Sequence, residues 1–222
     1  MRATLTARAA AWRDCGAFLP IDLERVTLRE LRAFDTQSLE PLLQDPVVQR
    51  FLPGVPRTPA EVARFAAWAE RQRCGGGYVC VAVTIASRPI GLIQAWPLDP
   101  SAATIEWGFA LARQYWGRGL FQESGRAFVS FAIAHLGAQR FEARAAVTND
   151  RGSAALRRLG ARREGVLRQC LTLNGSRVDC SMWSILAAEW PSTSAVASQP
   201  RQMDQDGWGK ASREANREVS TE

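Results

Sequence analysis

Short apolar runs separated by turn residues make up the middle of the chain. Residues 78–85, 90–96 and 104–111 are rich in β-branched and aromatic side chains, which is the composition of strands. Residues 87–89 and 97–101 carry the proline and serine that are typical of turns and loops. Consecutive strands joined by such short connections predict an antiparallel meander.

A second period, near 3.6 residues, predicts two well-marked helices around this meander. Residues 58–74 begin with strong start signals. Thr58 suits the cap, Pro59 suits the first turn, and Glu61 suits a capping box, in which side chain and backbone satisfy each other. The apolar positions of residues 121–136 recur at helical spacing, so a long helix is expected there.

Two shorter helices and several strands complete the predicted pattern. One helix has its apolar face within residues 35–44 and is ended by Pro46. The other starts at Asn149 or Asp150, which both suit an N-cap, and ends before Gly160. Further strands are expected at residues 26–31, 140–147, 166–173 and 177–186, the last two flanking an Asn-Gly hairpin turn.

Composition divides the 222 residues into three parts. Residues 1–20 lack the apolar stretch of a signal peptide and are expected to be an extension. Residues 21–191 carry the periodic pattern and are expected to form a single domain. The composition is that of an ordinary globular protein, with 46% apolar and 23% charged residues. From residue 192 onward polar residues and glycine dominate, which predicts a disordered tail.

Charge and hydropathy exclude some classes of function. The net charge of +6 mildly favours acidic partners, although a solubility feature is the preferred explanation over a dedicated nucleic-acid patch. No run of Lys or Arg resembles a nucleic-acid-binding segment, so no specific nucleic-acid partner is expected. No stretch of about 18 or more apolar residues occurs, so no membrane span is expected.

The cysteines and the histidine do not form a recognisable metal site. The five cysteines contain no Cys-x-x-Cys pair, and His135 is the single histidine. We therefore expect no structural zinc site. An odd cysteine count without a secretion signal is typical of a reducing cytosol, so a cytoplasmic location is expected. His135 falls on the apolar stripe of the long helix, where packing is its default role.

The candidate chemistry begins in residues 114–120, Gln-Tyr-Trp-Gly-Arg-Gly-Leu, which lie between a strand and the long helix. The first turn of a helix has backbone N–H groups without partners and a partial positive charge, so it can bind a phosphate. Gly117 and Gly119 would let the backbone approach closely, and Arg118 adds a full charge. Neither a Walker loop nor the dinucleotide fingerprint is matched, and many such loops bind nothing.

A longer pattern surrounds this loop. Gln114-x-x-Gly117-x-Gly119 matches the Gln/Arg-x-x-Gly-x-Gly/Ala signature of the acetyl-CoA-dependent N-acetyltransferases, the GNAT superfamily. A second motif of that superfamily is resembled by Asn149, Ser153, Leu159-Gly160 and Glu164-Gly165. The order of the motifs resembles the branch that contains the ribosomal-protein alanine N-acetyltransferases, over about residues 23–190. Ala161 departs from the family, which usually has Phe there.

The resemblance implies a fold and a cofactor site. The fold is of the α/β (α+β) type, a mixed and mostly antiparallel sheet of about seven strands with a central parallel pair that splays apart, and about four helices. The notch between the splayed strands would hold the pantetheine arm of acetyl-CoA, and no metal is involved. The residues implied in acetyl-CoA binding are Phe109, Ala110, Leu111, Gln114, Trp116, Gly117, Arg118, Gly119, Leu120, Asn149 and Ser153. The two N-terminal helices would lie over the acceptor site, where Phe51 and Trp68 could line an entrance, although core packing is the default role of each.

Glu106 is the catalytic candidate. It shares one face of its strand with Gly108 and Ala110, and a carboxylate among apolar residues is costly unless it is hydrogen-bonded or functional. A solvent-facing glutamate is the alternative. The resemblance implies that Glu106 deprotonates the acceptor amine, while a backbone N–H near Phe109 to Leu111 could hold the oxyanion. No general acid is assigned, because Tyr115 lies in the phosphate loop.

Three functions are therefore compared. The first is acetyl transfer from acetyl-CoA to a primary amine, with a protein N-terminal α-amine as the preferred acceptor. The second is transfer to a small amine such as an antibiotic or a polyamine. The third is a non-catalytic acyl-CoA-binding module. A homodimer through the C-terminal hairpin is compatible with each, and fold analogy identifies the cofactor better than the acceptor.

Overall fold

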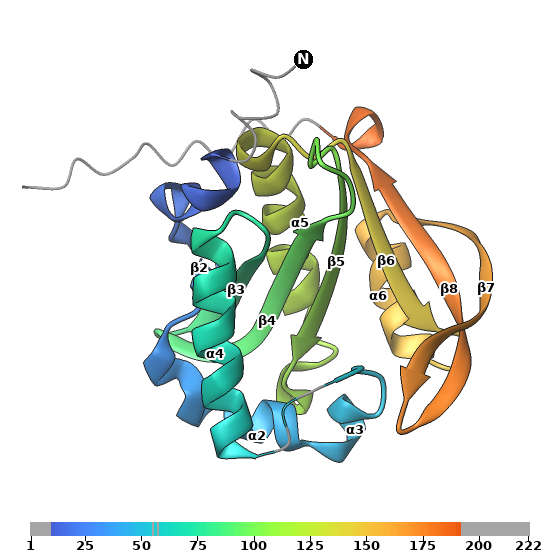
Figure 1. Cartoon of the computed structure of the whole chain (residues 1–222), viewed down its shortest axis with the longest axis horizontal. Helices are drawn as coiled ribbons and strands as arrows, with labels where there is room; N and C mark the ends of the chain where they lie inside the picture. Colours follow the sequence, from blue (N-terminus) through green and yellow to red (C-terminus); the bar gives the residue numbers. More distant parts are fainter. Residues whose placement is uncertain (1–9, 55, 57, 192–222) are drawn as a thin grey trace, which may run out of the picture.

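One mixed sheet of eight strands runs through the computed structural model, which describes residues 10–54, 56 and 58–191 (Figure 1). The order across the sheet is β1-β2-β3-β4-β5-β6-β8-β7. The strands are β1 (Ile21–Asp22), β2 (Thr27–Glu30), β3 (Val79–Ile85), β4 (Arg88–Pro97), β5 (Thr104–Leu111), β6 (Arg140–Ala146), β7 (Arg162–Leu173) and β8 (Ser176–Leu186). The expected seven strands are present, and the two-residue β1 is an addition.

Among the described strands, only the central pair, β5 and β6, is parallel, and all other neighbours are antiparallel. This confirms the expected mixed sheet. The connection from β5 to β6 passes through a helix, as a parallel pair requires. The hairpin between β7 and β8 turns at Asn174 and Gly175, whose φ angles of 49° and 80° are those of a type I′ turn.

The helices cover both faces of this sheet. They are α2 (Thr36–Gln44), α3 (Pro46–Gln49), α4 (Pro59–Cys74), α5 (Leu120–Phe131) and α6 (Asp150–Leu159). Figure 1 shows α2 and α4 on one face and α5 on the other. The capping box of α4 is formed as expected, because the Glu61 N–H donates to the Thr58 hydroxyl and the Thr58 N–H donates to the Glu61 carboxylate.

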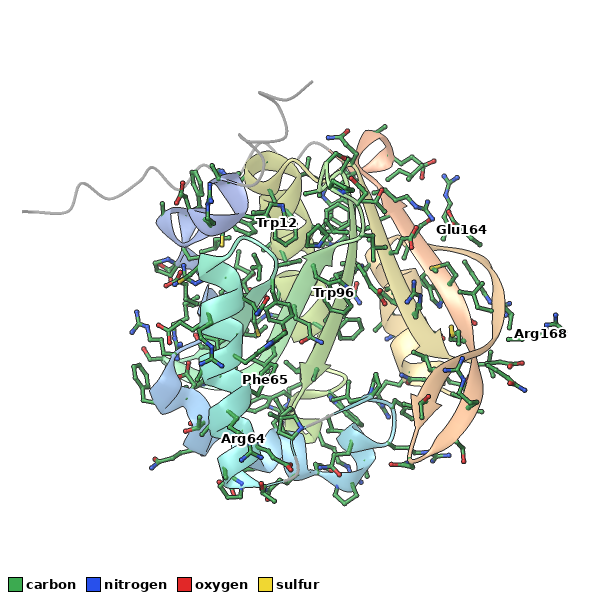
Figure 2. The ribbon with its side chains drawn as sticks, in the orientation of Figure 1. Trp12, Arg64, Phe65, Trp96, Glu164 and Arg168 are labelled. Carbon is green, nitrogen blue, oxygen red and sulfur yellow. A yellow bond between two sulfur atoms is a disulfide. The ribbon has the colours of Figure 1, made fainter. Side chains whose placement is uncertain are left out.

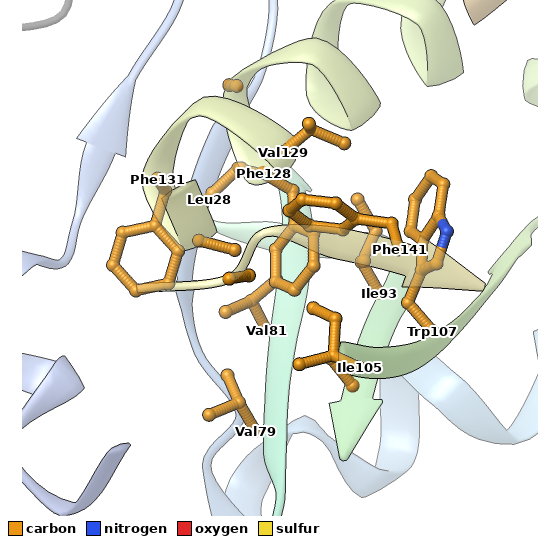
Figure 3. Packing of buried hydrophobic residues seen from close by; sticks show 14 of the residues in the cluster. Leu28, Val79, Val81, Ile93, Ile105, Trp107, Phe128, Val129, Phe131 and Phe141 are labelled. Carbon is orange, nitrogen blue, oxygen red and sulfur yellow. The ribbon is translucent and has the colours of Figure 1, made fainter. Parts of the chain in front are cut away.

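Alternate residues of the central strands feed two apolar cores on opposite faces of the sheet. On β3, Val79 and Val81 belong to the core under α5, whereas Cys80 and Ala82 belong to the core under α2 and α4. In the core under α5 the Trp107 ring lies 6.1 Å from that of Phe128 and 6.5 Å from that of Phe141, measured between centroids (Figure 3). Apolar packing therefore supports the strands on both faces of the sheet.

The long helix ends differently from the expected regular helix. After α5 the chain continues as a π-helical segment, η4 (Ala132–Leu136), and stops at Gly137, which has φ of 72°. His135 lies in this segment and its ring stacks on that of Phe18, with the centroids 3.9 Å apart. Partial burial lowers the pKa of His135. The expected packing role of His135 is thus the one that the structure shows.

The described part of the expected N-terminal extension packs on the domain. Trp12, which is labelled in Figure 2, and Cys15 are both fully buried and belong to the core under α5. Residues 1–9, and the tail expected from residue 192 onward, lie outside the described residues.

Cys170 on β7 and Cys180 on β8 form a disulfide. The sequence alone assigns no disulfide to the five cysteines. The register of the hairpin brings the two residues together, because β7 is irregular between Leu167 and Leu171 and the Cα atoms of the two cysteines lie 6.1 Å apart. Sequence spacing alone does not reveal this pairing.

Candidate active site

The parallel pair of strands separates along its length. Pairing between β5 and β6 covers only Thr104 to Glu106 on one strand and Arg140 to Glu142 on the other. Beyond these residues the two strands part towards the side of the molecule where α3 lies (Figure 1). The far half of β5 therefore has an edge that faces the gap between the strands.

Backbone groups of β5 are directed into this gap. The Ala112 N–H donates to the Ile90 carbonyl, beside β4, at 2.8 Å. Because backbone groups alternate in direction along a strand, the N–H groups of Phe109 and Leu111 point away from β4. They lie beyond the last residue pair of β5 with β6. This is the position at which the sequence predicts an oxyanion donor.

The loop after β5 has the backbone conformation that glycine allows. Gly117 and Gly119 have φ angles of 74° and 76°, in the left-handed region. Gly119 is the N-cap residue of α5 and its cap has no side-chain hydrogen bond. The Trp116 indole N–H donates to the Leu111 carbonyl at 2.6 Å, which ties the loop to the end of β5. The N-terminal N–H groups of α5 are thus presented beside the separated strands.

A cavity of about 720 Å³ lies against this loop. Its walls come from α3 and the residues after it, the end of β5, the loop, the start of α5, and α6. The lining residues are Val47, Val48, Arg50, Phe51, Leu52, Phe109, Ala110, Leu111, Tyr115, Trp116, Gly117, Gly119, Leu120, Phe121, Gln122, Thr148, Asn149, Asp150, Arg151, Gly152, Ala154, Ala155 and Arg158. The lining contains three arginines and one aspartate, so its positive charge favours an anion.

Most of the predicted acetyl-CoA-binding residues come together at this cavity. Those that line it are Phe109, Ala110, Leu111, Trp116, Gly117, Gly119, Leu120 and Asn149. Asn149 also caps α6, since its side-chain oxygen accepts from the Gly152 N–H at 2.9 Å. The expected capping role is therefore confirmed, while its contact with a ligand stays a prediction.

The other predicted residues do not line the cavity in the described part of the chain. Gln114 and Arg118 are exposed, and the Arg118 guanidinium lies over the Tyr115 ring, 5.8 Å from its centroid. Ser153 is on the first turns of α6, where its N–H donates to the Asn149 carbonyl. Glu106 is further back on β5, at the last position that pairs with β6.

Glu106 lies at the vertex of the separating strands and among other charges. Its carboxylate is 3.2 Å from a guanidinium nitrogen of Arg144, and the Glu106 side chain is 13% exposed. Burial raises the pKa of Glu106, and the nearby Glu142 carboxylate adds to this rise. The Arg144 charge and a hydrogen bond from Trp96 both lower the pKa. Trp96 pairs with Glu106 across β4 and β5 and is labelled near the middle of the sheet in Figure 2. A carboxyl group with a raised pKa is suited to proton transfer near neutral pH.

Several cavity residues are missing from the sequence prediction. Val47, Val48, Arg50 and Leu52 reach the cavity from α3 and the turn after it, and no local pattern distinguishes them from ordinary packing residues. Phe51 lines the cavity, whereas Trp68 packs against Tyr78, with the ring centroids 4.7 Å apart.

Arg151 and Arg158 were also missed. They lie two helical turns apart on α6, and the Arg151 guanidinium stacks 4.3 Å from the Trp116 ring centroid. Their spacing places them on one face of a helix that starts at a recognised motif, so it is a usable signal.

Two further properties hold for the described residues. No group of three or more His, Cys, Asp or Glu side chains could hold a metal ion there. None of the described helices combines the length and the apolar character needed to cross a membrane.

Comparison with known proteins decides the family. Residues 25–162, more than half of the chain, match the Acetyltransferase (GNAT) domain. The chain belongs to the GNAT acetyltransferase family. Members of this family use acetyl-CoA. The family and the names of the relatives both indicate that this GNAT protein is an N-acetyltransferase.

Three relatives show the range of similarity to this GNAT protein. N-acetyltransferase p20 of Bacillus licheniformis, itself uncharacterised, is 26% identical over 170 residues, which are 75% of this chain and 96% of p20. YdaF of Bacillus subtilis, provisionally named a ribosomal N-acetyltransferase, is 31% identical over 100 residues, 45% of this chain and 55% of YdaF. The structure of RimL, a ribosomal L7/L12 α-N-protein acetyltransferase in complex with coenzyme A, superposes with a TM-score of 0.69 at 19% identity, covering 76% of this chain and 98% of RimL. The last comparison shows a shared fold.

Proposed function

We propose that this GNAT protein binds acetyl-CoA in the cavity and transfers its acetyl group to a primary amine, with Glu106 as the general base. The preferred acceptor in this proposal is a protein N-terminal α-amine. One observation carries it: a cavity rich in arginine is bordered by the left-handed glycine loop and the uncapped start of α5. The same cavity reaches Phe109, on the strand that carries Glu106.

The residues present fit an anionic nucleotide ligand. Backbone N–H groups from Gly117 to Leu120 would hold the pyrophosphate, because they lie at a helix N-terminus whose N-cap has no side-chain bond. Arg151 and Arg158 on α6, with Arg50 after α3, add positive charge around the same space. The apolar lining at Phe109 and Leu111 suits an extended, mostly apolar arm. Acetyl-CoA would supply the activated acetyl thioester.

The chain's own groups would then serve the transfer. An acceptor amine arrives protonated and must lose a proton before it can attack a carbonyl carbon. Glu106 would accept this proton, directly or through water, an effect worth about 10²–10⁴-fold in rate. The N–H groups of Phe109 and Leu111, directed into the gap between the strands, would stabilise the oxyanion. The departing thiolate needs no strong acid, and no residue is assigned to that role.

The choice of a protein N-terminus as acceptor rests on the relatives. YdaF is provisionally named a ribosomal N-acetyltransferase, and RimL is named for its action on ribosomal L7/L12. A ribosomal-protein substrate is met in the cytoplasm, so the expected cytoplasmic location belongs to this proposal.

The cofactor part is tested by calorimetric titration with acetyl-CoA. Gly117→Asp places a carboxylate in the loop and should abolish binding. Gly175→Asp is the matched control, because Gly175 also has a left-handed φ, of 80°, and a Cβ there meets nothing within 4 Å. The control should bind like the wild type. A wild-type protein that does not bind acetyl-CoA would overturn the proposal.

The acceptor part is tested by assaying transfer to peptides with free N-termini, polyamines and aminoglycosides. We expect transfer to peptides, and a loss of about 10²–10⁴-fold in kcat/KM for Glu106→Gln with unchanged acetyl-CoA binding. Transfer only to small amines would show that the acceptor class is wrong. Binding of acetyl-CoA without transfer to any of these acceptors would favour the non-catalytic module.

A further inference from the structure

Arg25 joins the first turn of the sheet to the start of α5. It lies between β1 and β2, about a hundred residues before the glycine loop in sequence. The backbone N–H of Arg25 donates to one carboxylate oxygen of Glu123 at 2.8 Å, and its side-chain Nε donates to the other at 2.7 Å. A third bond runs from Arg25 Nη1 to the Arg118 carbonyl oxygen at 2.7 Å.

Glu123 is a problem for an anion site in this place. It lies in the first turn of α5, and its side chain is only 15% exposed. A free carboxylate there would repel a phosphate bound at the N-terminal N–H groups of the helix. Arg25 occupies both carboxylate oxygens, so these N–H groups stay open to a ligand.

The Arg118 carbonyl would be a second source of repulsion. In a trans peptide the C=O and the next N–H point in opposite directions. With the Arg118 carbonyl held by Arg25, the Gly119 N–H is directed away from Arg25, and Gly119 is one of the residues that line the cavity. The Arg25 guanidinium remains close, with Nη2 3.4 Å from the position of a Cβ on Gly119.

We infer that Arg25 is a positioning residue for the anion loop, whose main effect is to mask the Glu123 carboxylate from a bound pyrophosphate. This inference rests on the proposed function, since it assumes that the loop binds the pyrophosphate of acetyl-CoA. Arg25 itself does not line the cavity among the described residues, so it acts through Glu123 and the loop.

A calorimetric double-mutant cycle with acetyl-CoA tests the inference. Arg25→Ala should raise Kd by roughly tenfold, the size expected when a hydrogen-bonded charge pair is broken. The double variant Arg25→Ala/Glu123→Gln should recover most of the lost affinity, because it lacks the unmasked carboxylate charge. Its Kd is compared with that of Glu123→Gln alone. Should Arg25→Ala fail to fold, as judged by Tm, Arg25→Gln replaces it in the same cycle.

A surface ion pair provides the control. Arg162 and Glu189 lie 3.3 Å apart and are both exposed, so Arg162→Ala should leave Kd unchanged. If the wild type binds acetyl-CoA and Arg25→Ala has the same Kd, the inference is overturned and the proposed function stands. A loss that Glu123→Gln does not reverse would also overturn it. A wild-type protein without affinity for acetyl-CoA would overturn the inference and the proposed function together.

Discussion

At the scale of single residues, the pKa of the proposed base depends on neighbours from two strands. Glu106 meets Arg144 and Glu142 on β6 and Trp96 on β4. Arg144 opposes the effect of burial on the pKa of Glu106, and Glu142 strengthens it. In the proposed mechanism, the balance of these neighbours would set the working pH of the enzyme, and single substitutions should change it.

The pH profile of kcat/KM should follow this balance. Only the ionised carboxylate accepts a proton, so activity should fall as pH decreases through the raised pKa of Glu106. Arg144→Gln removes a positive charge that lowers the pKa of Glu106. This substitution should therefore raise that pKa further and move the acidic limb of the profile to higher pH. Glu142→Gln should move the limb in the opposite direction. A limb at the same pH in both variants would show that Glu106 is not the group that titrates.

At the scale of elements, α6 is stabilised by its N-cap residue, Asn149, and contributes charged side chains to the cavity. The Asn149 side chain satisfies the Gly152 N–H, and α6 then carries Arg151 and Arg158 to the cavity wall. A loss of the cap therefore affects both the helix and the site.

Asn149→Ala should lower the free energy of unfolding by about 1 kcal/mol, the usual cost of removing an N-cap. It should also weaken acetyl-CoA binding if Asn149 contacts the ligand as expected. Asn149→Ser keeps a capping oxygen and should recover the stability. Chemical denaturation and calorimetry measure the two effects separately. Equal stability of Asn149→Ala and wild type would contradict the capping contribution.

Local pattern was enough to predict most elements but not their arrangement. The apolar, β-branched runs of β3 and β5, the capping box of α4 and the Asn-Gly turn each depend on neighbouring residues, so the sequence shows them. The insertion of β8 between β6 and β7 depends on contacts between distant segments, and a hairpin fits a sheet in either orientation.

The same distinction applies to the candidate site. The glycine loop and Asn149 belong to contiguous motifs and were predicted. Arg25 meets Glu123 and Arg144 meets Glu106 only because the fold brings them together, and no spacing in the sequence encodes those contacts.

At the scale of the whole molecule, the site lies between regions of different charge. The cavity carries Arg50, Arg151 and Arg158. Around Glu106, a network interleaves three carboxylates with two guanidinium groups: Glu106, Glu142 and Glu164 with Arg140 and Arg144. This distribution suits an anionic donor on the cavity side and a cationic amine near Glu106.

The N-terminal segment should count as part of the domain in stability measurements. Trp12→Ala should lower the free energy of unfolding by about 3–5 kcal/mol, because a fully buried tryptophan leaves a large cavity. Trp68→Ala is the control, since Trp68 is 40% exposed and should cost less. A small and equal effect of both substitutions in a denaturant titration would place residues 10–20 outside the cooperative unit.

The order of strands in the sheet also bears on synthesis of the protein. β8 lies between β6 and β7, yet it is the last strand to leave the ribosome, so β6 has no partner on that side until residue 186 has emerged. Since β6 carries Arg144 and leads to α6, the site cannot be completed on a shorter nascent chain. Stalled chains that end just before β8 should therefore fail to bind acetyl-CoA, whereas released full-length protein should bind it. The enzyme would become active only after β8 has been translated.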